Sequence, residues 1–160
     1  MKIIPIFPYD KGFFTIVDDE DYIILKNIRW YLFNNNGKLY AEGMVDSKKV
    51  RIHSFIVNPP KGSQVDHKDG NGLNNCKSNL RACTQQQNNF NRKKYKINTT
   101  GFKGVYRNHN RFVARINANK KQINLGNYVT AQEAAIAYDE GCILYHGDFA
   151  LTNRMMGLLV

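Results

Sequence analysis

A long central part of the chain lacks acidic residues, since the next one after Asp69 is Glu133. Over all 160 residues, 23 lysines and arginines outnumber 13 acidic residues, for a formal net charge of +10. A basic stretch can be simply a solvated face, but a run of this length without carboxylates favours a polyanionic partner. The cations of this interval are Lys77, Arg81, Arg92, Lys93, Lys94, Lys96, Lys103, Arg107, Arg111, Arg115, Lys120 and Lys121.

Cysteines and long apolar runs are also scarce. The three cysteines form no CxxC pair, which argues against a disulfide framework or a four-cysteine zinc site. No segment approaches the roughly 18 apolar residues of a membrane span, and the first residues, MKIIPIFPYDKG, lack the apolar core of a signal peptide. We therefore expect a soluble, cytoplasmic protein in a reducing environment, with no membrane partner.

The first sixty residues predict a small β module. Asn34 to Gly37 form a strong hairpin signal, and Asp18 and Asp19 can cap a helix that runs through Lys26. Trp30 and its aromatic neighbours favour a small core, with base stacking as the alternative. The predicted strands are 2–7, 12–17, 29–33, 39–45 and 50–53, the last leading into an apolar turn before Pro59-Pro60.

Residues 64–92 combine an Asp-His pair, a Gly/Asn-rich loop and two further Asn clusters. They predict a strand that ends at Asp66-His67, a polar loop, a strand over 80–83 and a helix from Thr84. In such a β-β-α unit, oxygens of Asp66 and Asn88 can converge on a hard cation such as Mg²⁺. Neutral His67 can take a proton from water beside them. An ion and a base suffice for phosphodiester hydrolysis.

His67, Asn79 and Asn88, within VDHKDGNGLNN and SNLRACTQQQNN, resemble the HNH endonucleases of phages and mobile introns. Their separations of twelve residues (79 − 67) and nine residues (88 − 79) agree with that family. The resemblance implies that Asp66 and Asn88 bind one Mg²⁺ or Mn²⁺ ion and that His67 is the general base. It also implies that Asn79 holds the loop and so orients His67, and that His53 has a supporting role.

Neighbouring residues leave alternatives open. Asn75 competes with Asn79, and Asn89 and Asn91 compete with Asn88, because each is an adjacent amide of the same type. By its own sequence context, His53 is either a structural hydrogen-bonding histidine or a ligand. The basic residues Arg92, Lys93 and Lys94 open a linker over 93–100, which we interpret as tracking DNA phosphates or serving as a solvated spacer.

Residues 101–128 predict three strands, followed by a helix that begins with a capping box at Thr130 and Glu133. In residues 111–117, alternation assigns Arg111, Val113, Arg115 and Asn117 to one face and Phe112, Ala114 and Ile116 to the other. Small and aromatic residues recur at helical spacing behind the capping box and predict a core stripe that includes Cys142. One sheet face can therefore pack on the helix while the other offers arginines.

The segments GVYR, RFVARI, INLGNY and LYHGDFALTN resemble the DNA-binding domain of plant ethylene-response (APETALA-type) transcription factors. In that family a three-stranded sheet lies in the major groove and a helix packs behind it. The resemblance implies that Arg107, Arg111 and Arg115, with Lys121 and Asn124, face double-stranded DNA. The first hairpin is shorter than the plant pattern, and Phe112 and Asn124 stand where tryptophans are usual. The target sequence therefore does not transfer.

Together these features predict an α+β chain with three parts: an N-terminal β module with the nuclease motif (1–92), a linker (93–100) and a DNA-binding domain (101–160). The predicted function is a metal-dependent, homing-type HNH endonuclease, encoded by a phage or mobile element, that uses no small-molecule cofactor. One catalytic site per chain favours a monomer over a dimer. The alternatives are a DNA-binding regulator that keeps an inactive nuclease fold, and a basic RNA-binding module.

Overall fold

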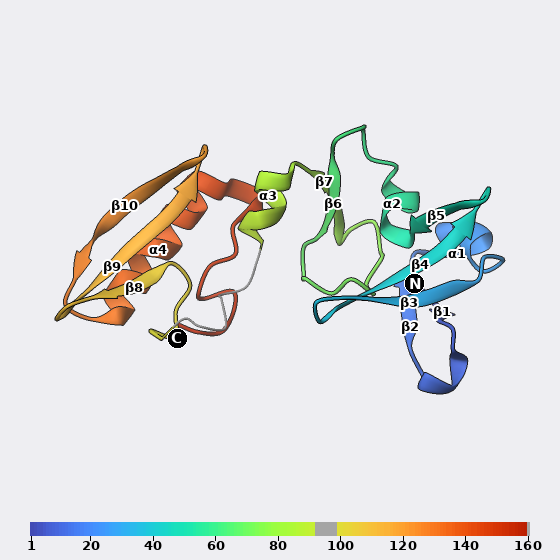
Figure 1. Ribbon diagram of the computed structural model, residues 1–160, viewed down its shortest axis with the longest axis horizontal. Helices are drawn as coiled ribbons and strands as arrows, with labels where there is room; N and C mark the ends of the chain where they lie inside the picture. The colour runs from blue at the N-terminus through green and yellow to red at the C-terminus, as the bar shows by residue number, and fades with distance from the viewer. Residues whose placement is uncertain (92–98, 160) are drawn as a thin grey trace. The chain divides into compact units, whose positions relative to one another are not determined.

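The computed structural model describes residues 1–91 and 99–159 (Figure 1). The chain divides into two compact units, Met1–Asn88 and Asn89–Val160. Both units combine small antiparallel sheets with helices, so the α+β prediction is confirmed. Among the helices of the described residues, none has the length and apolar character needed to cross a membrane.

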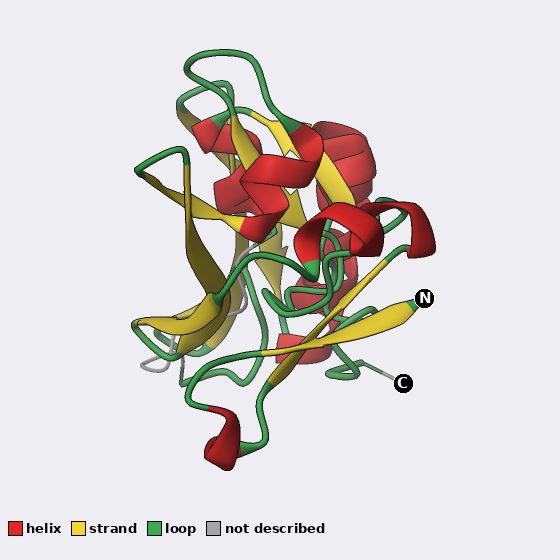
Figure 2. Ribbon diagram, turned by 90° about the vertical axis from the view of Figure 1, so that its right-hand side faces the viewer, coloured by secondary structure: helices red, strands yellow, loops and turns green. Residues whose placement is uncertain are grey.

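The first unit contains three small antiparallel sheets, with strand orders β1-β2, β3-β4-β5 and β6-β7. Figure 2 shows the β1–β2 hairpin, which begins at the N-terminus and carries the short helix η1 at its tip. The predicted hairpin around Asn34–Gly37 joins β3 and β4, and Asn34 Oδ1 accepts a hydrogen bond from the Gly37 amide at 2.8 Å. The elements are β1 (Lys2–Pro5), η1 (Tyr9–Lys11), β2 (Phe14–Val17), α1 (Asp19–Leu25), β3 (Trp30–Asn35), β4 (Lys38–Val45), β5 (Lys48–Arg51), α2 (Ile52–Val57), β6 (Gln64–His67), β7 (Leu80–Cys83) and α3 (Gln85–Phe90).

Trp30 is at the centre of the core of this unit. Its side chain is 1% exposed, and its indole Nε1 donates a hydrogen bond to the carbonyl oxygen of Leu25 at 3.0 Å. This bond satisfies the only polar atom of the ring, so burial of the large side chain is favourable. The prediction that Trp30 is a core residue is therefore confirmed. The other buried core residues are Ile4, Ile6, Val17, Leu25, Ala41 and Ile52.

The segment around His53 differs from the prediction. We expected a strand over residues 50–53 and an apolar turn after it, but β5 ends at Arg51 and helix α2 begins at Ile52. The helix buries Ile52 and His53, and Ile56 packs against the same core. Asn58 ends it in the left-handed conformation, directly before the two prolines. A six-residue apolar run is too short for its periodicity to separate a helix from a strand.

The loop between β6 and β7 is held against strand β2. The amide of Ile16 donates to Leu73 O at 2.9 Å, and the amide of Asn75 donates to Ile16 O at 2.8 Å. Further along, the amide of Lys77 donates to Asp18 Oδ2 at 2.7 Å. The N-terminal hairpin thus acts as a scaffold that fixes the conformation of the polar loop.

The second unit is a three-stranded antiparallel sheet, in the order β10-β9-β8, packed on helix α4. The predicted capping box is present, because Thr130 Oγ1 accepts from the Glu133 amide and the Glu133 carboxylate accepts from the Thr130 amide. Cys142 is fully buried on the predicted stripe. The elements are β8 (Val105–Asn108), β9 (Arg111–Ala118), β10 (Lys121–Tyr128), α4 (Ala131–His146) and η2 (Gly147–Phe149).

The end of α3 is part of this second unit. The ring of Phe90 stacks on the imidazole of His146, with centroids 3.6 Å apart and planes within 9°. Lys103 Nζ donates to the Phe90 carbonyl oxygen at 2.7 Å and to the Leu151 carbonyl oxygen at 3.1 Å. The division between the two units therefore falls within helix α3.

Candidate active site

The predicted β-β-α unit is built from β6, β7 and α3. Strands β6 and β7 pair in antiparallel register, with Asp66 opposite Arg81 and His67 opposite Leu80. Thr84 caps α3, because its Oγ1 accepts from the Gln87 amide at 3.2 Å and the Gln87 side chain accepts from the Thr84 amide at 2.9 Å. Asp66 and His67 therefore come from the end of β6, and Asn88 comes from the helix that follows β7.

His67 is 5% exposed and begins a chain of buried hydrogen bonds. Its Nε2 lies 3.0 Å from Asn75 Oδ1, and Asn75 Nδ2 donates to Thr15 Oγ1 at 2.7 Å. The Thr15 hydroxyl in turn donates to the Leu73 carbonyl oxygen at 2.9 Å. A carbonyl oxygen can only accept, so the direction of every bond in the chain is fixed.

This direction determines which ring nitrogen of His67 carries the proton. Asn75 directs its amide nitrogen towards Thr15 and its oxygen towards His67, so Nε2 is the donor and Nδ1 is the nitrogen with the lone pair in the neutral ring. Burial lowers the pKa of His67, while the Asn75 hydrogen bond and the nearby Asp69 and Asp66 carboxylates oppose this shift. The ring is thus neutral at physiological pH and has the protonation state of a general base.

His53 packs against His67 from helix α2. The two rings meet edge to face, with centroids 4.9 Å apart and planes at 87°, and Tyr40 lies 5.5 Å from the His53 ring. Burial, followed by the charges of His67 and Arg51, lowers the pKa of His53 to about 3. Among the described residues, its Nδ1 has no hydrogen-bond partner. His53 therefore contributes a neutral, rigid ring surface beside His67.

Asn79 holds the two ends of the polar loop together. Its Nδ2 donates to Asp69 Oδ1 at 3.0 Å and to the Asn74 carbonyl oxygen at 2.8 Å, and its Oδ1 accepts from the Asp69 amide at 3.1 Å. The backbone of Asn79 also accepts from the Lys68 amide at 2.9 Å. Asn79 thus fixes the residues that directly follow His67, whereas Asn75 bonds to the His67 ring itself.

Asp66 and Asn88 are the two residues predicted to bind the metal ion. Asp66 is 6% exposed, and Asn88 Nδ2 donates to Gln64 Oε1 at 2.6 Å, which links α3 to strand β6. No cluster of three or more His, Cys, Asp or Glu side chains that could hold an ion occurs within residues 1–91 and 99–159. One carboxylate and one amide fit Mg²⁺, which retains several waters and binds through few protein ligands together with substrate phosphates.

The predicted DNA-contacting residues of the second unit lie on two sides of its sheet. Residues opposite one another in an antiparallel ladder share a face. Arg115 pairs with Asn124, and Arg111 lies on the same face of β9; all three side chains are exposed. Arg107 and Lys121 pair with Phe112 and Ala118, whose face is turned towards α4.

Val113 is 2% exposed although it shares the outer face with Arg111 and Arg115. Its partner in β8 is Tyr106. Arg115 Cζ lies over the Tyr106 ring, 6.0 Å from the ring centroid.

The remaining predicted DNA contacts, Arg92, Lys93 and Lys94, lie outside the described residues, as does most of the predicted linker.

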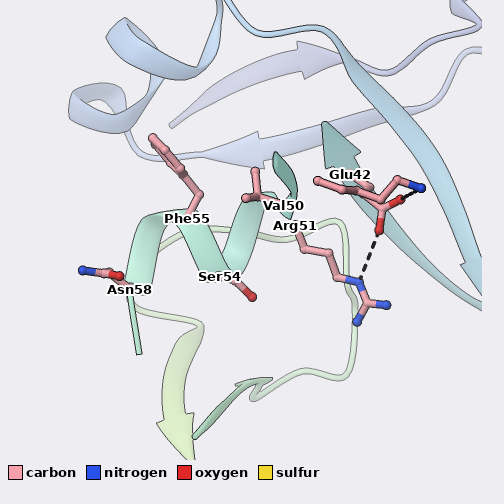
Figure 3. A pocket seen from close by; sticks show the side chains of 7 residues that line it. Glu42, Val50, Arg51, Ser54, Phe55 and Asn58 are labelled. Carbon is pink, nitrogen blue, oxygen red and sulfur yellow. Dashed lines mark ion pairs between the residues drawn. The ribbon is translucent and has the colours of Figure 1, made fainter. Parts of the chain in front are cut away.

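A hollow of about 770 Å³ lies beside helix α2 (Figure 3). Its wall includes Arg51, which forms an ion pair with Glu42 at 3.9 Å, together with Ser54, Phe55 and Asn58. The guanidinium of Arg51 also covers the Tyr40 ring, with 5.4 Å from Cζ to the ring centroid. The predicted catalytic residues do not line this hollow, so the pocket is separate from the site on β6 and α3.

Residues 58–90 match the family model described as HNH endonuclease. An uncharacterized HNH endonuclease of Acanthamoeba polyphaga mimivirus, L560, is 33% identical over 152 residues, which cover 91% of this chain and 77% of that protein. The chain belongs to the HNH endonuclease family. The enzymes of this family are phosphodiesterases that act as nucleases, so the predicted enzyme class is confirmed. This HNH endonuclease is also similar to protein 3.8 of Escherichia phage T7, with 38% identity over 93 residues, 57% of this chain and 76% of that protein.

Thr15 is the member of the site that the sequence did not indicate. It lies on β2, 52 residues before His67 (67 − 15), and contacts the site only because the polar loop docks on that strand. In the sequence Arg81 is one of many residues in a basic interval, yet its Nε and Nη2 donate to Asp66 Oδ2 at 2.9 and 2.6 Å. The pairing of Asp66 with Arg81 across β6 and β7 is a feature of register, which the sequence pattern did not specify.

Proposed function

We propose that this HNH endonuclease hydrolyses phosphodiester bonds in double-stranded DNA with one divalent ion, at positions selected by its second unit. The hydrogen-bond chain from His67 to Leu73 carries this proposal, because it fixes the tautomer of the imidazole with the lone pair on Nδ1, while burial favours the neutral ring. The viral relatives are in keeping with a phage or mobile-element setting.

His67 Nδ1 removes a proton from the attacking water while Asn75 retains the hydrogen bond to Nε2. The water oxygen forms a bond to phosphorus, and the bond from phosphorus to the 3′ oxygen breaks. The leaving oxygen takes a proton from solvent water, which gives a 5′-phosphate and a 3′-hydroxyl. Asp66 and Asn88 would hold the divalent ion, which would polarise the phosphate and stabilise the leaving oxygen. Asn79 keeps the backbone after His67 in place, and His53 limits movement of the ring.

The outer face of β8–β10 is the proposed DNA-reading surface. It presents the arginines 111 and 115 together with the amide side chains Asn117, Gln122, Asn124 and Asn127, all exposed and on one side of the ladder. Arginine pairs with guanine and asparagine or glutamine with adenine in the major groove, so this set can read both kinds of base pair. Arg107 and Lys121 lie on the opposite face of the sheet, on its two edge strands, and are suited to contact DNA phosphates there. The proposed architecture remains that of the ethylene-response-factor domain.

Cleavage of supercoiled plasmid DNA tests the proposal. We expect nicked or linear product in Mg²⁺ or Mn²⁺, no product in EDTA, and at least about a 10²-fold loss of rate in Asp66→Ala. The control variant Asp46→Asn removes the charge of an exposed carboxylate in the β4–β5 turn, tolerates the left-handed backbone there (φ 48°) and should cleave at the wild-type rate.

Two outcomes would contradict the proposal. Sequence-specific DNA binding without cleavage in any divalent metal would instead support a regulator with an inactive nuclease fold. Stronger competition by duplex RNA than by duplex DNA would support the RNA-binding alternative, because a flat sheet does not fit the deep, narrow major groove of A-form RNA.

A further inference from the structure

Arg81 makes the closest described contact with the predicted metal ligand Asp66. The two residues are directly opposite each other in β6 and β7. Arg81 Nε and Nη2 both donate to the same oxygen of Asp66, Oδ2, at 2.9 and 2.6 Å. The side chains are 16% and 7% exposed, so the ion pair is largely shielded from water.

This contact conflicts electrostatically with metal binding. Asp66 provides a single negative charge, and the guanidinium already neutralises it. A divalent ion on the same carboxylate would lie within a few ångströms of a permanent cation, in a region where screening by water is weak. A metal ion can therefore displace the Arg81 guanidinium from Asp66 only where a second anion is present to bind that guanidinium.

The substrate itself contains such an anion. A guanidinium has a planar fork of donors that binds a phosphate as well as it binds a carboxylate. The scissile phosphate must reach the ion at Asp66, and that position is within the reach of an arginine whose head group already contacts the same carboxylate. A phosphate at this point can compensate the charges of both the ion and the guanidinium.

We propose that Arg81 is a phosphate-binding residue that occupies Asp66 in the free protein and transfers to the scissile phosphate when DNA and metal bind. Metal and DNA consequently bind as a cooperative pair, and the free enzyme has low affinity for divalent ions. This inference rests on the proposed function, because it takes Asp66 as the metal ligand and DNA as the substrate.

Calorimetric titration of the full-length protein with Mn²⁺, without DNA, tests the first half of this inference. We expect Arg81→Gln to bind Mn²⁺ about tenfold or more tightly than the wild type, because the competing cation is removed. Arg81→Lys keeps the charge and should remain close to the wild type. Equal or weaker Mn²⁺ binding by Arg81→Gln, with the fluorescence of Trp30 showing a folded first unit, would overturn the proposal.

The same titration with a 20-base-pair duplex tests the second half. We expect the duplex to tighten Mn²⁺ binding about tenfold or more in His67→Ala, which serves as a background without cleavage, and to tighten it by a clearly smaller factor in the double variant His67→Ala/Arg81→Gln. Equal tightening in both proteins would show that Arg81 does not couple the ion to the phosphate.

The variant Asp66→Ala separates this inference from the proposed function. If Asp66→Ala still binds Mn²⁺ with unchanged affinity, the metal ligand is wrongly assigned and the proposed site fails. If Asp66→Ala loses Mn²⁺ binding while Arg81→Gln equals the wild type, only the role of Arg81 is wrong.

Discussion

The two units of the chain present their functional side chains in opposite ways. In the first unit Asp66, His67, Asn75 and Asn79 are each at most 9% exposed and lie in a network of hydrogen bonds. In the second unit the side chains that we propose to read DNA are exposed on the surface of a sheet. The polar residues of the first unit therefore have their geometry before any substrate arrives.

This contrast follows from the two tasks. A general base must be held in one orientation and one tautomer, and buried hydrogen bonds supply that preorganisation. A reading surface must give up its water and form new bonds with bases, so its side chains are best exposed in the free protein. Substitutions in the first unit should therefore change the rate of cleavage, and substitutions on the outer sheet face should change where the enzyme binds.

Removal of the base should have the largest effect. In His67→Ala we expect single-turnover cleavage of plasmid DNA to fall about 10²–10⁴-fold, the usual contribution of a general base, with DNA affinity within about twofold of the wild type. The control His109→Asn removes an exposed imidazole from the turn between β8 and β9, where the left-handed backbone (φ 52°) accepts asparagine, and should retain most of the rate. Undiminished cleavage by His67→Ala would show that another group activates the water.

Loss of the two outer-face arginines should have the second-largest effect. We expect Arg111→Ala/Arg115→Ala to weaken binding to a preferred duplex about 10²-fold and to relax site choice, because each good arginine–guanine pair contributes about 1–3 kcal/mol. The matched control Arg107→Ala/Lys121→Ala should weaken binding to all sequences alike and reduce the salt dependence. Equal footprints and affinities for the outer-face variant and the wild type would contradict the reading surface.

Interruption of the hydrogen-bond chain at Thr15 should have a smaller effect on cleavage. Thr15→Val keeps the shape of the side chain but leaves Asn75 Nδ2 without its 2.7 Å acceptor, a loss of about 1–3 kcal/mol for a buried group. We expect cleavage about tenfold slower and a lower free energy of unfolding. Unfolding is measured by the fluorescence of Trp30, which lies in the same unit. Thr15→Ser retains the hydroxyl and should restore the rate. A Thr15→Val enzyme that is destabilised but cleaves at full rate would reduce the chain to a purely structural role.

The smallest expected effect concerns stability alone, at Lys103 in the second unit. Burial lowers the pKa of Lys103 from 10.5 to about 8. Between pH 8 and 10.5 the unfolded chain binds a proton that the native chain does not, so the contribution of Lys103 to stability rises with pH by up to about 1.4 kcal/mol per unit.

Comparison of wild type and Lys103→Met by hydrogen exchange of the α4 amides measures this contribution. We expect the stability of the wild type relative to the variant to increase from pH 8 to 10.5, while cleavage at neutral pH stays similar. A difference that is constant over this range would show that the Lys103 amine titrates at its ordinary pKa.

Most of the local structure could be predicted from the sequence, because capping, turn and alternation patterns depend on residues close together in the chain. The capping box at Thr130 and Glu133, the Asn-Gly hairpin and the alternation in β9 each depend on residues within a few positions of one another. The α+β class and the enzyme class followed from such segments. Helix α2 was missed because a short apolar run between a strand and two prolines has no decisive period.

The hydrogen bonds that join the residues of the candidate site were harder to predict from the sequence. The spacing of His67, Asn79 and Asn88 indicates the motif, but two adjacent amides of the same type, Asn75 and Asn79, fit one role in the sequence equally well. Both amides contact the site, one through the ring of His67 and one through the backbone after it. The contribution of Thr15 depends on a strand and a loop that meet from distant parts of the chain, which is a tertiary property.

The six residues of helix α3 have a consequence for modularity. Asn88 bonds to β6, and two positions later Phe90 stacks on His146 in the second unit. A fragment that ends at Asn88 would remove the last residues of the helix that bears a predicted metal ligand. A nuclease module that keeps helix α3 whole therefore extends two residues past the geometric boundary, through Phe90, and a second unit joined to it must offer Phe90 a partner such as His146.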